Sequence, residues 1–236
     1  MPESLRDDRV RPRGREMSRL EALSDAIFGF SATLLVVSLE APRTFGELRA
    51  ILAGFVPVAL SFAMLLFIWL AHNAFFRRYG LQDGVTVAIN SVLLFVVLFY
   101  VYPLRFLATS FTQYLLGGEV AVRPALGSFD ALASLFTVYS LGFVALFACF
   151  VAFYVNAARR ADAFSLTPLE RYDAATAARH YLLFVLVGAL SAILAWGGIG
   201  IGIGLPGWAY FLLGPLCFWN GWSRGRRRAA LLPAAA

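Results

Sequence analysis

The chain has 236 residues, of which 60% are hydrophobic and only 14% are charged, and its mean hydropathy is +0.74. These values exclude an ordinary soluble globular domain. The formal net charge is +6, and the basic residues are all arginine. We therefore expect an all-α, polytopic membrane protein with one membrane domain.

Residues 1–17 form a polar, arginine-rich segment. The apolar stretch that follows is too long for a signal peptide and lacks a small-residue cleavage site. A basic arm can bind nucleic acid, but a cytoplasmic tail of a membrane protein is the commoner case, and we expect no nucleic-acid partner. We assign residues 1–17 and 223–236 as cytoplasmic segments flanking a transmembrane domain at 18–222.

Hydropathy predicts six transmembrane helices in this domain. With the amino terminus inside, most of the arginines fall in inner segments, which places both termini in the cytoplasm. The sixth helix is the least regular, since residues 196–208 mix Gly and Pro with apolar residues and could form a tight outer hairpin. The predicted spans are 19–40, 51–75, 85–107, 129–156, 179–202 and 206–222.

The first span begins with Ser18 and Glu21 at the spacing of a capping box. An apolar stripe follows at i, i+4 and i+7, formed by Phe30, Leu34 and Val37. This stripe could face lipid or another helix, or it could form a hydrophobic constriction repeated around a symmetry axis. Periodicity alone does not choose between these interpretations.

Polar residues occur inside three successive spans. An acid at the depth of Asp25 is costly unless it is paired, and is therefore a candidate functional residue. The predicted topology places it in the same third of the membrane as polar groups of the next two helices. We predict one polar cluster that locks the first three helices together and supports the first of them, formed by Arg19, Ser24, Asp25, Trp69, His72 and Asn90.

The second half of the chain carries fewer polar signals. Thr167 could cap a short surface helix that begins with Pro168. The glycines of residues 197–204 have the small-xxx-small spacing of closely packed helices. No catalytic constellation, metal-ligand spacing or disulfide framework is evident, so we predict neither an enzyme nor a cofactor.

Three motifs, one in each of the first three spans, resemble a known family. They are Arg19-x-x-x-Leu23-Ser24-Asp25 followed by TLLV, Trp69-Leu-Ala-His72 followed by Phe-Phe-Arg, and Asn90 with Leu-Leu-Phe after it. These resemble the transmembrane protein 175 family, the lysosomal potassium channels and their bacterial relatives. Leu23 stands where the family motif R-x-x-x-F-S-D has Phe.

The resemblance implies a potassium-permeable channel in the bacterial inner membrane, assembled as a homotetramer with the first helix around the pore axis. It places the constriction at Phe30, Leu34 and Val37, and potassium is the only ligand it implies. The chain lacks the TVGYG filter, so an apolar ring would control ions by excluding water. Two alternatives remain open: a proton or small-cation leak through Asp25 and His72, and a non-conducting membrane scaffold.

Overall fold

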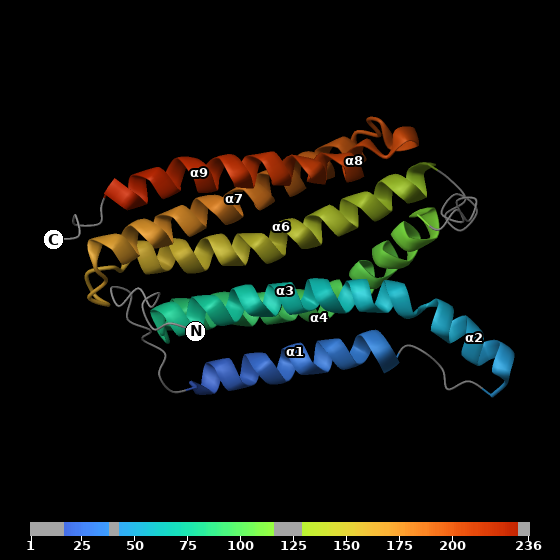
Figure 1. Cartoon of the computed structure of the whole chain (residues 1–236), viewed down its shortest axis with the longest axis horizontal. Coiled ribbons are helices and arrows are strands. Elements are labelled where there is room, and N and C mark those ends of the chain that lie inside the picture. Colours follow the sequence, from blue (N-terminus) through green and yellow to red (C-terminus); the bar gives the residue numbers. More distant parts are fainter. Residues whose placement is uncertain (1–16, 38–42, 116–128, 231–236) are drawn as a thin grey trace.

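The computed structural model describes residues 17–37, 43–115 and 129–230, and all regular structure within them is helical. This confirms the all-α prediction. Short helical segments are α2 (Phe45–Ala53), η2 (Ile201–Ile203), α8 (Leu205–Trp208) and η3 (Ala209–Leu212). The six long helices, drawn in Figure 1, are α1 (Arg19–Val37), α3 (Phe55–Tyr79), α4 (Gly84–Leu115), α6 (Phe129–Arg159), α7 (Pro168–Trp196) and α9 (Leu213–Ala230).

Four of these helices, α3, α4, α6 and α7, are long and apolar enough to cross a membrane. The two remaining long helices are shorter, and α9 is also more polar. Helix α1 has 19 residues and includes Arg19, Glu21 and Asp25, and α9 has 18 residues and ends in the sequence RGRRRAA. Both are nevertheless parallel to the apolar helices along most of their length (Figure 1).

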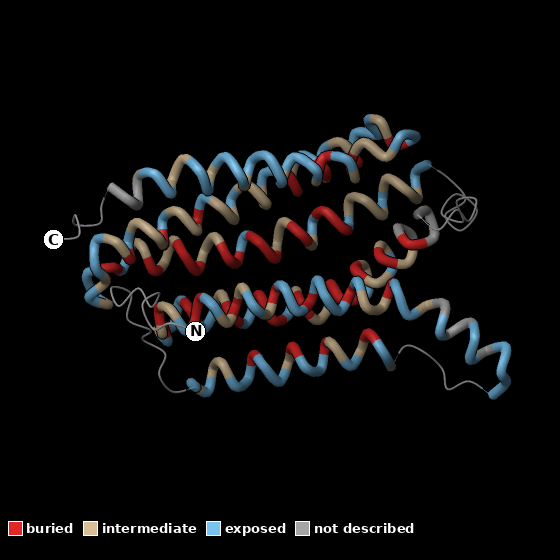
Figure 2. Tube along the Cα trace, viewed as in Figure 1, coloured by how far each residue is buried: buried red, intermediate tan, exposed pale blue. Residues whose placement is uncertain are grey.

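The long helices form two groups of three. Helices α1, α3 and α4 pack against one another, α7 packs against α6 and α9, and the two groups meet mainly where α4 packs against α6. Helix α1 lies at one edge of the bundle and α9 at the opposite edge (Figure 1). Burial follows this order: the central helices carry most of the buried residues, and α1 and α9 leave long exposed faces (Figure 2).

Aromatic side chains fill the junction between the two groups. Phe75 and Phe76 of α3 and Phe153 of α6 are each at most 1% exposed. The rings of Phe75 and Phe153 are stacked with centroids 4.8 Å apart, and Tyr154 meets Phe75 edge-on. Each such pair stabilises the fold by about 0.5–1.5 kcal/mol beyond the effect of its buried area. This aromatic cluster therefore fixes how the two groups meet near the ends of α3 and α6.

Two predicted boundaries need correction. The second span does not start at residue 51, because a separate helix, α2, ends at Ala53 and α3 starts only after Gly54. The fifth span does not start at residue 179. Thr167 does cap a helix, and forms a capping box with Glu170, but this helix is not short: it continues without a break from Pro168 to Trp196.

The glycine-rich residues 197–204 do not pack two helices together, so that interpretation was wrong. Gly198, Gly200 and Gly204 have φ values of 67°, 67° and 70°, in the left-handed region where glycine pays no steric penalty. They produce a tight turn between α7 and α8. The alternative of a compact hairpin over residues 196–208 is therefore the correct one, and the last long helix starts at Leu213.

Candidate functional site

Helix α1 contacts the rest of the chain through one face. Ser24, Phe28, Ser31 and Leu35 are the buried residues of this helix, each at most 4% exposed. Their spacing of four, three and four residues aligns them on one side of the helix. They face α3 and α4, the two helices against which α1 packs. No described residue of the chain covers the opposite side of α1.

The uncovered side of α1 is mostly apolar and includes Phe30. Phe30 is 58% exposed and its neighbours along this side, Ala26 and Thr33, are exposed as well. Of the other two residues in the predicted stripe, Leu34 is half-buried and packs against the hydrophobic core, and the side chain of Val37 lies outside the described part of the structure. Sequence periodicity did not single out Thr33, which adds a hydroxyl to the same side as Phe30.

A chain of hydrogen bonds connects α3, α4 and α1. His72 Nε2 lies 2.8 Å from Asn90 Oδ1, Asn90 Nδ2 lies 2.9 Å from Ser24 Oγ, and Ser24 Oγ lies 2.8 Å from the carbonyl oxygen of Leu20. The carbonyl can only accept, so the Ser24 hydroxyl donates to it and accepts from the Asn90 amide. The Asn90 oxygen then faces His72, which must donate from Nε2.

The three side chains that form this chain of hydrogen bonds are completely enclosed. Ser24 and Asn90 are 0% exposed and His72 is 1% exposed. The His72 ring also packs between Phe28 of α1 and Phe76, with centroid distances of 5.5 and 4.6 Å. A buried polar group is costly without a partner, and here the Asn90 amide supplies a partner to both His72 and Ser24.

Asp25 and Arg19 lie outside this enclosed chain. Asp25 is on the exposed side of α1 and accepts a 2.7 Å hydrogen bond from Trp69 Nε1 of α3. Within the described residues it forms no hydrogen bond with His72, and the exposed Arg19 contacts neither group. The predicted residues therefore divide into the chain Ser24–Asn90–His72, the separate pair Asp25–Trp69, and Arg19.

The far end of α1 has a polar contact that sequence analysis missed. Arg105 Nη1 of α4 donates to the carbonyl oxygen of Leu35 at 3.2 Å. In the sequence, Arg105 follows Tyr100, Tyr102 and Pro103, a pattern typical of a membrane interface that does not indicate a contact with the first helix. Its bond to α1 means that α4 holds this helix near both of its ends.

A second enclosed chain of hydroxyl groups lies in the other half of the molecule. Tyr210 donates to Ser140 at 3.0 Å, Ser140 to Ser191 at 2.9 Å, and Ser191 to the carbonyl oxygen of Pro206 at 2.8 Å. It joins α6 and α7 to the segment after the glycine-rich turn. Single serines in apolar spans gave no sequence signal of this kind.

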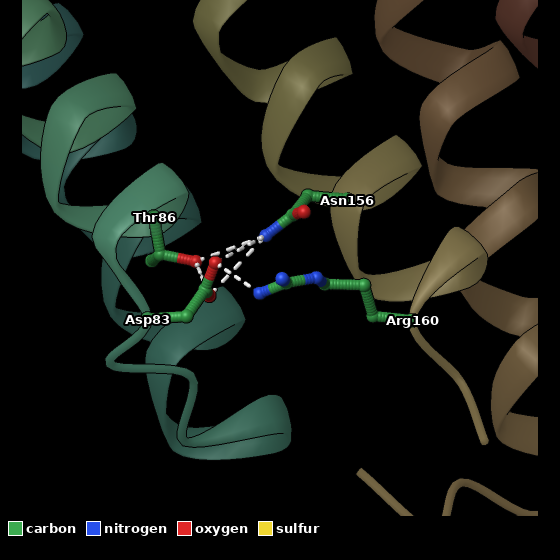
Figure 3. Close-up of polar contacts among 4 residues, drawn as sticks. All are labelled: Asp83, Thr86, Asn156 and Arg160. Atoms are coloured by element: carbon green, nitrogen blue, oxygen red, sulfur yellow. Dashed lines mark hydrogen bonds and ion pairs between the residues drawn. The ribbon is translucent and has the colours of Figure 1, made fainter. Parts of the chain in front are cut away.

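A third polar cluster joins the start of α4 to the end of α6 (Figure 3). Asp83 accepts from Arg160 Nη1 at 2.7 Å and from Thr86 Oγ1 at 2.5 Å, and Asn156 Nδ2 lies 3.3 Å from the same carboxylate. Burial acts to raise the pKa of Asp83, but the hydrogen bonds from Thr86 and Asn156 and the Arg160 charge outweigh it, so its pKa is lowered. Nearby, Arg78 of α3 forms an ion pair with Asp173 of α7.

Comparison with known proteins matches the three-helix group that contains α1. The family described as "Endosomal/lysosomal potassium channel TMEM175" matches residues 19–100. A protein of Marivirga tractuosa named "Potassium channel" is 37% identical over 214 residues, which cover 86% of each chain. A potassium channel of Chamaesiphon minutus is 26% identical over 80% of this chain and 91% of its own.

Solved structures agree with this result over nearly the whole chain. The crystal structure of a variant of the potassium channel MtTMEM175, bound to a nanobody fusion protein, superposes with a TM-score of 0.83 and 34% identity. It covers 93% of this chain and 98% of its own. The structure of a Chamaesiphon minutus homologue, at 22% identity and a TM-score of 0.51, shares the fold. The chain therefore belongs to the TMEM175 family.

Proposed function

We propose that the chain is a potassium-permeable channel in which the uncovered side of α1 lines the pore. The relatives named as potassium channels support the choice of ion. The position of the pore rests on one observation: α1 lies at the edge of the bundle, packs by a single face, and leaves Phe30 58% exposed on the other. The described residues of one copy enclose no pore there, so we propose a homotetramer with four copies of α1 around the axis.

The constriction in this proposal is centred on Phe30, with Leu34 and Val37 towards the far end of the helix. An apolar ring raises the barrier for hydrated ions by excluding water, and no TVGYG filter is needed for such a gate. The enclosed chain Ser24–Asn90–His72 would then hold the opposite side of α1 against α3 and α4. It fixes the rotation of the helix and so determines which residues face the pore.

The proposed orientation places both termini in the cytoplasm of a bacterial cell, in its inner membrane. Arginines concentrate at one end of the bundle, at the ends of α3, α6 and α9 and the start of α7, and this end is expected to be cytoplasmic. The described arginines at this end include Arg77, Arg78, Arg159, Arg160, Arg171, Arg224 and Arg226.

Potassium flux from liposomes that contain the purified chain tests the proposal. Wild type should release potassium faster than protein-free vesicles, and Phe30→Ala should raise the flux or weaken the preference for potassium over sodium. Phe218→Ala is the matched control, because Phe218 is also a highly exposed phenylalanine (74%) but lies on α9 at the opposite edge of the bundle. Absence of potassium flux in wild type, or equal effects of the two substitutions, would contradict the proposal.

Proton flux in the same vesicles separates the channel from a proton pathway through Asp25 and His72. Asp25 is bonded to Trp69 and His72 to Asn90, so the two titratable groups have no direct contact in the described structure. We expect Asp25→Asn to leave any proton flux unchanged. Loss of proton flux in this variant, with potassium flux retained, would favour the proton pathway instead.

A further inference from the structure

A groove with a cavity volume of about 480 Å³ lies between α7 and α9, on the side of the molecule away from α1. It is part of neither the α1 site nor the polar clusters described above. Its walls are of two kinds. One part is formed by leucines, including Leu182, Leu186 and Leu216, and the other by Arg179, Arg224 and the polar residues beside them.

The two kinds of wall are separated along the helix axis. Helix α7 runs away from the arginine-rich end, so Leu182 and Leu186 lie successively deeper in the bundle than Arg179. From Arg179 to Leu186 the helix rises about 10 Å. The groove is therefore basic at the arginine-rich end and apolar towards the middle of the membrane, which is the polarity of a lipid in the leaflet at that end.

The basic mouth of the groove has no acidic partner within the described residues. The described ion pairs at the arginine-rich end are Arg78–Asp173 and Arg160–Asp83, and neither includes an arginine of the groove. Arg179 is exposed, and Arg224 is half-buried with its guanidinium 6.0 Å from the Tyr172 ring. Trp219, 65% exposed at the groove, has the amphipathic character typical of a membrane interface. The two arginines without acidic partners are suited to bind a phosphate group, and the apolar walls beside them are suited to bind the acyl chain joined to it.

We propose that this groove binds an anionic phospholipid, with its phosphate between Arg179 and Arg224 and one acyl chain along the leucines of α7 and α9. The inference rests on the membrane orientation proposed above for the choice of the cytoplasmic leaflet. Binding itself needs no ion flux, so failure of the lipid site and failure of the channel proposal are distinguishable.

Thermal unfolding of the purified full-length chain in detergent micelles, titrated with phosphatidylglycerol or phosphatidylcholine, tests the site. Phosphatidylglycerol should raise the apparent Tm of wild type more than phosphatidylcholine does. The double variant Arg179→Ala/Arg224→Ala should need at least about tenfold more phosphatidylglycerol for half of the effect, because charge-assisted hydrogen bonds are lost. The control is Arg159→Ala/Arg171→Ala, which removes the same charge from exposed positions at the same end, outside the groove.

A second variant tests the apolar part without changing charge. Leu186→Trp adds bulk where the acyl chain would lie and should weaken the phosphatidylglycerol effect with both arginines in place. Equal responses to the two lipids, or an equal loss in the control variant, would overturn the proposal. It would also be overturned if the groove variants changed the oligomeric mass of the protein and left the lipid response intact, since a second copy would then cover the groove.

Discussion

Asp83 and Arg160 belong to different halves of the bundle, and the 2.7 Å ion pair between them ties the start of α4 to the end of α6. The ion pair between Arg78 and Asp173 joins the halves again at the same end. The aromatic cluster around Phe75 joins the same two groups by packing. The two three-helix groups are therefore fixed to each other at the arginine-rich end by charge as well as by packing.

Replacing Asp83 should loosen this junction. Asp83→Ala removes the acceptor for Arg160, Thr86 and Asn156 together, and the side chain of Asp83 is only 13% exposed. We expect a loss of about 1–3 kcal/mol in the free energy of unfolding, measured as a lower apparent Tm in detergent. Asp162→Ala is the control, since this exposed aspartate lies close by and should shift stability by less than about 0.5 kcal/mol. Equal shifts in both variants would show that the cluster adds nothing.

The same carboxylate should make stability depend on pH. The pKa of Asp83 is lowered in the folded chain from its ordinary value of 3.8, so the folded state favours the charged form. This contribution is complete above the unfolded value and disappears as the pH falls through the lower, folded pKa. The difference in Tm between wild type and Asp83→Asn should be constant at neutral pH and shrink below about pH 4. A difference that grew on acidification would have the wrong sign for this mechanism.

Much of this architecture could be predicted from the sequence, because long apolar runs and arginine bias are properties of single segments. The number and order of the long helices followed from hydropathy. The grouping of Ser24, His72 and Asn90 followed from the need of buried polar groups for partners. In contrast, the separation of Asp25 from this chain depends on the rotation of α1, which neither the spacing of residues nor their type determines.

The missed features depend on tertiary contacts and backbone conformation. Ser140, Ser191 and Tyr210 are ordinary residues of apolar segments until the fold brings their hydroxyls within hydrogen-bonding distance. The glycines after Trp196 have the spacing of packed helices, yet three of them adopt left-handed conformations that end the helix. The start of α7 at Pro168 was predicted from the Thr167 cap, but its continuation into the fifth span was missed, because the first part of this helix is polar.

Asn90 should be the most sensitive residue of the enclosed chain. Asn90→Ala leaves the Nε2 hydrogen of His72 without its acceptor at a site that is 1% exposed, a loss of about 1–3 kcal/mol. Ser91→Ala is the control, because Ser91 is exposed and bonds only to its own helix at Val87. Thermal unfolding of both variants measures the difference. A combined His72→Leu/Asn90→Leu variant should recover part of the lost stability, since it removes both polar groups together. If the stability losses of the two single variants simply added in the double variant, this would argue against coupling between His72 and Asn90.

Gly142 allows α4 and α6 to approach closely. A Cβ atom at this position would lie 2.5 Å from the ring of Tyr100, which is itself buried and donates to the carbonyl oxygen of Tyr139. Gly142→Ala should therefore destabilise the chain by about 1–3 kcal/mol through overpacking. Gly214→Ala on α9 should be neutral or slightly stabilising, because a Cβ atom there would meet no other described group within 4 Å. Partial rescue of Gly142→Ala by Tyr100→Leu would locate the strain at this contact, and no rescue would place it elsewhere.

Gly200 offers a test of the turn that replaces the expected glycine packing. Its φ of 67° costs an alanine about 1–2 kcal/mol, and a Cβ there would also lie 2.6 Å from Cβ of Leu205. The two effects act together, because the turn brings Leu205 back over the glycine, where the Leu205 amide donates to the carbonyl oxygen of Gly200 at 3.0 Å. Gly202→Ala is a control two residues away, where the added Cβ would meet only Phe129, at 3.6 Å, and no positive φ is required. Thermal unfolding should show a clear loss for Gly200→Ala and little change for Gly202→Ala. Equal losses would mean that glycine is required throughout the segment, as close helix packing would demand, and would contradict the turn.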